Sequence, residues 1–152
     1  FIKPGLIHAI GKGVVLAEIQ QTSDITYRVY DYKRKDSEGN ERELHTEEAK
    51  AAIDFDANNE YKVSYTSAEN KKTVLVENEY FKTKEIKLTQ SLTLDYSATD
   101  SFVIYMNVEG TTTVEVEGFT ETLELGETLL IPACFNEVKI TSKNATLLEV
   151  TI

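Results

Sequence analysis

Residues 102–133, FVIYMNVEGTTTVEVEGFTETLELGETLLIPA, contain four strand-like runs in direct succession. Apolar and polar residues alternate within most of these runs, and glycine or proline lies at or next to the end of each, as in antiparallel strands with one buried face. Comparable runs lie on both sides, at residues 61–65, 73–88, 91–96, 137–142 and 146–152. So many short strands predict a mainly β fold of the sandwich, jelly-roll or barrel type. No helical segment separates two of these runs, which disfavours a parallel α/β sheet.

The first part of the chain predicts fewer strands. One is expected at residues 14–19, which are mostly apolar and β-branched, and a second at residues 26–32, where aromatic and polar residues alternate. The sequence QQTSD at residues 20–24 predicts a polar turn between them.

A helix is predicted within residues 41–55, ERELHTEEAKAAIDF, because apolar residues recur there at helical spacing. Thr46 is the predicted N-cap, since a threonine side chain can accept a hydrogen bond from a free N–H at the start of a helix. Glu47 and Glu48 follow, and negative charge in the first turn favours a helix.

Length and composition allow a stable core. With 152 residues, of which 41% are hydrophobic, the chain is expected to form about one domain. The polar stretch DFDANNE at residues 54–60 nevertheless predicts a boundary between two modules, residues 1–55 and 56–152. The first module would have few elements with which to build a core, so we expect it to be incomplete.

Charge and motifs exclude several classes of function. The net charge is −10 and the pI is about 4.7, so neither nucleic acid nor a membrane is an expected partner. The single cysteine, Cys134, and the absence of a signal peptide or a long apolar run favour a cytoplasmic protein. The nucleotide-binding and zincin motifs do not occur, and the sequence does not indicate an oligomeric state.

Two residues of the first module are candidates for chemistry. His8 follows a Pro-Gly turn in PGLIHA; a neutral imidazole is a common zinc ligand, although a lone histidine is more often a core residue. Glu18 lies in the apolar run VVLAEIQ, where a buried, unpaired carboxylate would be costly. It therefore faces a polar cavity or lies on an edge strand, and the adjacent Gln20 and Gln21 favour the cavity. His45 is expected to be solvated.

Arg28 is the third candidate, in SDITYRVYDY, where three tyrosines surround it. A guanidinium can bind a phosphate or an oxyanion through two parallel hydrogen bonds, and aromatic rings can stack on it. The alternative is a surface arginine that pairs with Asp24 or Asp31. A basic run at residues 33–35, which includes Arg34, is more typical of a solvated turn than of a phosphate clamp.

Three segments, in this order, resemble a known family. They are PGLIHAIGKG at residues 4–13, EIQQTSDITYRVYDY at residues 18–32 and RELHTEEA at residues 42–49. Together they resemble the bacterial type I mannose-6-phosphate isomerases, also called phosphomannose isomerases, over residues 1 to about 53. The resemblance implies a cupin-type enzyme with two β-barrel modules that interconverts mannose 6-phosphate and fructose 6-phosphate with one zinc ion.

The same resemblance implies roles for individual residues. His8 would be a metal ligand, Glu18 and Arg28 catalytic residues, and Arg28 and Arg34 residues that bind the sugar phosphate. Residues 1–55 would be the C-terminal part of the catalytic cupin module. The three other metal ligands of the family, a glutamine, a histidine and a glutamate, have no counterpart here. The resemblance thus implies the C-terminal portion of a longer enzyme, inactive alone because catalytic zinc takes three or more protein ligands.

The second module, residues 56–152, also resembles a cupin, through FVIYMNVEG, LELGETLLIPA and FNEVKI. Metal-binding cupins commonly place a histidine after a segment like IPA, whereas Cys134, Phe135 and Asn136 stand here. We therefore expect a metal-free, structural barrel. The alternative function is a non-catalytic cupin module that binds a sugar or a protein through this barrel and its tyrosines, without need of the catalytic candidates.

Overall fold

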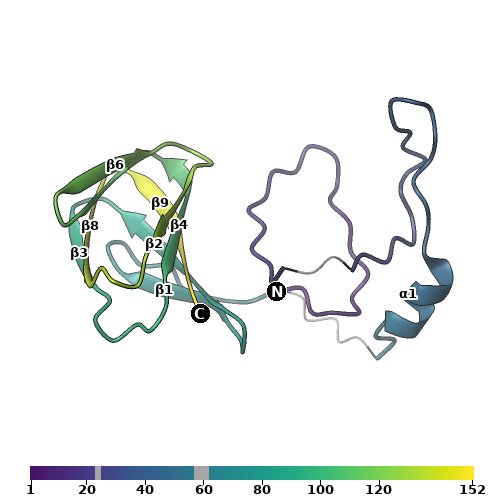
Figure 1. The fold of residues 1–152 in the computed structure, drawn as a ribbon, viewed down its shortest axis with the longest axis horizontal. Helices are drawn as coiled ribbons and strands as arrows, with labels where there is room; N and C mark the ends of the chain where they lie inside the picture. Colours follow the sequence, from purple (N-terminus) through teal and green to yellow (C-terminus); the bar gives the residue numbers. More distant parts are fainter. Residues whose placement is uncertain (23–24, 57–61) are drawn as a thin grey trace. The chain divides into compact units, whose positions relative to one another are not determined.

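The computed structural model describes residues 1–22, 25–56 and 62–152. The chain divides into two compact units, which are drawn in Figure 1: residues 1–62, here called unit 1, and residues 63–152, called unit 2. The module boundary predicted at residues 54–60 falls mostly outside the described residues, so its position stays a prediction.

Unit 2 consists of two antiparallel β-sheets. Its strands are β1 (Lys72–Glu77), β2 (Lys82–Leu88), β3 (Leu92–Asp95), β4 (Val103–Gly110), β5 (Thr112–Val116), β6 (Phe119–Leu123), β7 (Thr128–Ile131), β8 (Glu137–Thr141) and β9 (Ala145–Thr151). One sheet has the order β1-β2-β9-β4-β7 and the other β3-β8-β5-β6. The predicted mainly β fold is confirmed, and every run predicted from residue 73 onward contains a strand.

Two of the predicted runs differ from the structure. Residues 73–88 form two strands, because the side chain of Asn78 accepts hydrogen bonds from the N–H groups of Tyr80 and Phe81, at 2.8 and 3.1 Å, and so turns the chain. The run predicted at residues 61–65 forms no strand over its described part, where the backbone has no neighbouring strand with which to pair.

The core of unit 2 lies between its two sheets. Ile86 on β2 pairs with Leu147 on β9, and both side chains are fully buried. Burial of one such side chain contributes about 1.5–3 kcal/mol. The buried cluster comprises Ile86, Leu88, Tyr96, Val103, Tyr105, Val114, Leu123, Ile131, Val138, Ile140 and Leu147. Strands from both sheets contribute to it, so one core stabilises the whole unit.

A charged cluster lies beside this apolar core. Glu149 on β9 is fully buried, and its carboxylate binds the ammonium groups of Lys72 at 2.7 Å and Lys84 at 2.6 Å. The Tyr96 hydroxyl donates to Glu149 and also bonds to the hydroxyl of Tyr105. Burial raises the pKa of Glu149, but the bonds from both lysines and Tyr96 outweigh it and hold this pKa below its ordinary value. Glu149 is therefore an ionised carboxylate with its partners in place.

Unit 1 contains one short helix among its described residues, α1 (Thr46–Ala52). The predicted helix and its acidic first turn are confirmed. The predicted N-cap is wrong: Thr46 is already helical, and His45 occupies the N-cap position without a side-chain bond to the helix. The helix ends because Ile53 is extended, with φ −66° and ψ 131°. Among the described residues, no helix has the length and apolar character to cross a membrane.

The two strands predicted for unit 1 are not formed. Residues 14–19 and 26–32 have extended or irregular backbone, and the described residues offer neither of them a neighbouring strand. A strand is stable only where its N–H and C=O groups pair, so an apolar pattern alone does not create one. Val15, in the first of these segments, is 97% exposed as a result. The turn predicted at residues 20–24 lies partly outside the described residues.

Candidate functional site

A pocket in unit 1 brings together three of the four predicted site residues. It has a volume of about 660 Å³, and His8, Glu18 and Arg28 all line it, whereas Arg34 does not. The other lining residues are Pro4, Gly5, Leu6, Ile7, Gln20, Ile25, Thr26, Tyr27, Val29, Tyr30, Ala49, Ala52 and Ile53. Charged and polar groups from three separate segments thus share one cavity with an apolar side, an arrangement typical of small-molecule sites.

The position of the first segment depends on Gly5. Its φ of +87° is a conformation that other residues adopt only with strain. A Cβ atom there would lie 2.9 Å from both the carbonyl oxygen of Ala52 and the nitrogen of Asp54. The carbonyl oxygen of Gly5 accepts a hydrogen bond from the N–H of Asp54 at 3.0 Å. The Pro4–Gly5 turn therefore packs directly against the C-terminal end of α1.

His8 follows this turn with a defined tautomer. Its Nδ1 lies 2.9 Å from the carbonyl oxygen of Leu6. A carbonyl oxygen can only accept, so Nδ1 carries the proton and the lone pair of Nε2 remains available. A hydrogen bond from one ring nitrogen to a backbone carbonyl is the usual way in which proteins prepare the other nitrogen for a metal.

The remainder of a metal site is not provided by the described residues. Among them, no three histidine, cysteine, aspartate or glutamate side chains are placed to hold an ion together. A catalytic zinc takes three protein ligands, and His8, the predicted ligand, would be one of them, so the described part of the chain does not by itself fit the ion. The predicted zinc stays a prediction.

Arg28 is half-buried in the pocket wall, and its side chain is held by the segment that precedes α1. Its Nη1 donates to the carbonyl oxygen of Glu43 at 3.1 Å. Neither partner proposed from the sequence holds it in the described residues: Asp31 binds two other arginines, and Asp24 lies outside them. A guanidinium has five N–H groups, so the Arg28 side chain can bind an anion in the pocket as well as the carbonyl oxygen of Glu43.

His45, predicted to be solvated, is instead half-buried and bonded to Arg28. Its Nδ1 accepts a hydrogen bond from the N–H of Arg28 at 3.1 Å, and its own N–H donates to the carbonyl oxygen of Arg28 at 2.8 Å. Sequence reasoning missed this contact because it joins residues 17 positions apart. No periodic pattern signals such a contact; only the fold brings the two segments together.

Glu18 lines the pocket with an exposed side chain. This agrees with the prediction, made from the polar residues that follow it, that Glu18 faces a cavity. Gln20 lines the same cavity. The carboxylate therefore avoids the cost of burial because it faces an open pocket, and the apolar run around it is itself largely exposed.

Arg34 belongs to a different cluster. Its Nε donates to the carboxylate of Asp31 at 3.0 Å, and Arg42 donates from its own Nε to the same carboxylate at 2.7 Å. The hydrogen bonds from Arg42 and Arg34 hold the pKa of Asp31 well below its usual range. This cluster connects the beginning and the end of the loop at residues 31–42. The predicted role of Arg34 in binding a substrate stays a prediction.

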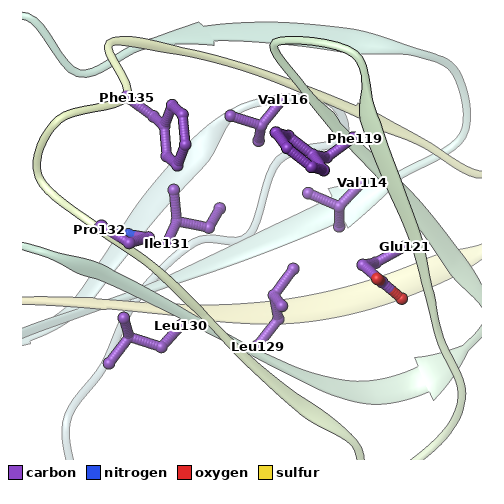
Figure 2. Close-up of a pocket in the computed structure, with 9 residues that line it drawn as sticks. All are labelled: Val114, Val116, Phe119, Glu121, Leu129, Leu130, Ile131, Pro132 and Phe135. Carbon is purple, nitrogen blue, oxygen red and sulfur yellow. The ribbon is translucent and has the colours of Figure 1, made fainter.

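Unit 2 has a smaller pocket, of about 120 Å³, among β5, β6 and β7. Figure 2 shows the apolar side chains that converge on it, with the carboxylate of Glu121 at one side. Its lining residues are Val114, Val116, Phe119, Glu121, Leu129, Leu130, Ile131, Pro132 and Phe135. A sugar needs several hydrogen-bonding partners, and this lining offers one side chain that can supply them. Tyr96 and Tyr105 are committed to the buried cluster, so this pocket gives little support to the sugar-binding alternative.

The two antiparallel sheets of unit 2 are those of a β-sandwich or jelly roll, and comparison with known proteins gives the class as cupin. Residues 71–151 match the family model described as "Mannose-6-phosphate isomerase, cupin domain". The chain therefore belongs to the mannose-6-phosphate isomerase family, as the resemblance of its first 53 residues had predicted.

Individual relatives extend the similarity to both units. The mannose-6-phosphate isomerase of Streptococcus mutans is 32% identical over 87% of this chain, and mannose-6-phosphate isomerase ManA of Bacillus subtilis is 33% identical over 92% of it. The chain spans 42% and 44% of the length of these relatives. The crystal structure of the mannose 6-phosphate isomerase from Bacillus subtilis matches with a TM-score of 0.71 and 32% identity, over 86% of this chain and 41% of that one.

Proposed function

We propose that the protein containing this chain is a zinc-dependent aldose–ketose isomerase that interconverts mannose 6-phosphate and fructose 6-phosphate. The observation that carries the proposal is the unit 1 pocket, which is lined by a carboxylate, a guanidinium and an imidazole with an available Nε2. Membership of the family and the names of the relatives support the choice of substrate. The single cysteine of the chain favours a reducing compartment, so we include a cytoplasmic location in the proposal.

The reaction moves a hydrogen between C2 and C1 of the open-chain sugar through an enediolate. In the proposal, the Glu18 carboxylate accepts the proton that leaves C2 and returns it to C1, while the proton of the C2 hydroxyl passes to the oxygen on C1. Arg28 binds the negative charge, either on the phosphate or on the enediolate oxygen, through its guanidinium. Ala49 and Ala52 of α1 give the cavity an apolar side.

His8 and Arg34 have supporting roles in the proposal. His8 supplies one zinc ligand through Nε2, and the other ligands come from residues beyond those described, so no step is assigned to the metal. Arg34 makes a secondary contact with the substrate, for which its exposed guanidinium must exchange Asp31 for the sugar phosphate.

The test is conversion of mannose 6-phosphate to fructose 6-phosphate by the product of the complete open reading frame that contains this chain. The sample is measured before chelation, after it, and after zinc is restored, beside a His8→Ala variant. We expect turnover that disappears with chelation, returns with zinc and is lost in the variant. The 152 residues alone should be inactive, because His8 is their single candidate ligand.

Two results would count against this proposal. Undiminished turnover after complete chelation would remove the zinc from it. No turnover in any sample, with folding verified by circular dichroism, would favour the alternative of a non-catalytic cupin module that binds a sugar or a protein.

A further inference from the structure

The backbone of Arg28 is bonded at both of its polar groups to His45. The Arg28 N–H donates to Nδ1 of His45 at 3.1 Å, and the Arg28 carbonyl oxygen accepts from the His45 N–H at 2.8 Å. A residue held at both groups cannot rotate about its backbone without breaking one of these bonds. The direction in which the Arg28 side chain leaves the backbone is therefore set by His45.

The same segment also holds the end of the side chain. Glu43, two residues before His45, accepts from Nη1 of Arg28 through its carbonyl oxygen at 3.1 Å. Tyr27 packs the edge of its ring against the imidazole, with 6.4 Å between the ring centroids. One hydrogen bond thus holds the guanidinium of Arg28, and two hold its backbone.

His45 is in turn fixed by α1. Its carbonyl oxygen accepts the N–H of Ala49 at 2.9 Å, and Ala49 is buried and lines the same pocket. Since the C-terminal end of α1 packs against Gly5, the helix links the segment of His8 at one end to the segment of Arg28 at the other. This seven-residue helix sets the spacing of the two functional groups.

We propose that His45 is a positioning residue, which orients Arg28 to bind the phosphate of the sugar phosphate. The proposal deepens the isomerase function and rests on it for the identity of the ligand. An N–H can only donate, so Nδ1 of His45 must be the unprotonated nitrogen and Nε2 carries the proton. Arg28 is then positioned by an acceptor atom at the place of Nδ1. Substitutions that keep or move this acceptor test the proposal.

Asparagine and glutamine differ in where they place such an acceptor. In His45→Asn the amide oxygen can occupy the place of Nδ1, whereas in His45→Gln the longer side chain carries it past that place. Both variants are polar and similar in size, so they separate the hydrogen bond from general effects on packing. Thr46→Ala, at the exposed first residue of the helix, is the matched control.

The first measurement is the affinity for inorganic phosphate, by NMR titration of the product of the complete open reading frame. We expect His45→Gln to weaken binding at least about fivefold, the equivalent of one lost hydrogen bond, and His45→Asn and Thr46→Ala to stay within about twofold of the unmodified protein. In an Arg28→Gln background, His45→Gln should cause no further loss, because its effect passes through Arg28.

Equal behaviour of the asparagine and glutamine variants, additive losses in the double variant, or phosphate binding that does not depend on Arg28 would each overturn the inference. Turnover of mannose 6-phosphate by the same samples separates it from the proposed function. The expected phosphate pattern without any turnover would leave the role of His45 intact and remove the isomerase. If His45→Gln leaves both turnover and phosphate binding unchanged, the isomerase function stands and the proposed role of His45 is removed.

Discussion

Gly5 is the residue on which the geometry of the His8 segment depends most. Its positive φ and the close approach of Ala52 and Asp54 leave no room for a side chain. Gly39 has the same φ of +87°, but no atom lies within 4 Å of the place that a Cβ would take there, so a substitution would meet only the strain of the backbone conformation. The two glycines therefore form a matched pair that separates backbone strain from steric conflict.

We predict that Gly5→Ala destabilises the protein more than Gly39→Ala does. For Gly39→Ala the expected loss in free energy of unfolding is about 1 kcal/mol, from the left-handed backbone. For Gly5→Ala the contact with backbone atoms of α1 should raise it to about 2–3 kcal/mol. Urea denaturation of both variants measures the difference, and equal losses would mean that the turn does not pack against the helix as described.

At the scale of elements, strands β1, β2 and β9 are joined by charge as well as by backbone bonds. Lys72 on β1 and Lys84 on β2 both bind Glu149 on β9. Removal of one partner from a buried ion pair leaves the other charges without compensation, which is far more costly than the loss of an exposed pair. The exposed pair Glu115 and Lys139, on β5 and β8, provides the comparison.

Glu149→Gln should therefore lower the free energy of unfolding by about 3–5 kcal/mol, because two lysines remain partly buried without a counterion. Glu115→Gln, the same chemical change in an exposed pair, should cost less than about 1 kcal/mol. Thermal and urea denaturation of the two variants measure the two losses in free energy of unfolding. Similar losses for both would show that the buried cluster contributes no more than a surface pair.

The elements also show what can be read from sequence and what cannot. The strands of unit 2 were predictable because alternation and turn residues are local signals, and α1 because its spacing is local too. The strand order β2-β9-β4 was not predictable, because β2 and β9 pair although they lie far apart along the chain. Residues 14–19 failed for a related reason: their pattern is that of a strand, but pairing depends on a neighbour that the described residues lack.

The candidate site divides in the same way. His8, Glu18 and Arg28 were selected through short motifs and the family resemblance, and they do line one pocket. His45 was missed because its importance lies in a tertiary hydrogen bond. The family resemblance also implied a role for Arg34, whose bond to Asp31 no motif indicates. Residue identities were thus predictable where they form a motif, and their partners were not.

At the scale of the whole molecule, buried and paired carboxylates set the response to acid. The pKa values of Asp31 and Glu149 are both lowered from ordinary values of 3.8 and 4.5, by arginines in one unit and by lysines and a tyrosine in the other. A carboxyl with a lowered pKa binds fewer protons folded than unfolded. Its contribution to stability is therefore complete above the unfolded value and is lost as the pH falls below it.

We accordingly predict that the urea midpoint is nearly constant from pH 7 to about 5 and then falls steadily below about pH 4.5. Above the pI of about 4.7, acid also reduces the net charge of −10, which by itself would favour the compact state; below the pI the net charge is positive, and its repulsion adds to the loss. A midpoint that rises or stays level down to pH 3 would be incompatible with this prediction.

Whether the unit 1 pocket is the site of a sugar-phosphate isomerase is decided by kcat/KM for mannose 6-phosphate. The samples are the product of the complete open reading frame and its Glu18→Gln and Arg28→Gln variants, with Glu38→Gln, an exposed loop glutamate outside the pocket, as the control. We expect losses of at least about 100-fold for the two pocket variants and less than about twofold for the control. Turnover that survives both pocket substitutions at the unmodified rate would show that the reaction takes place elsewhere.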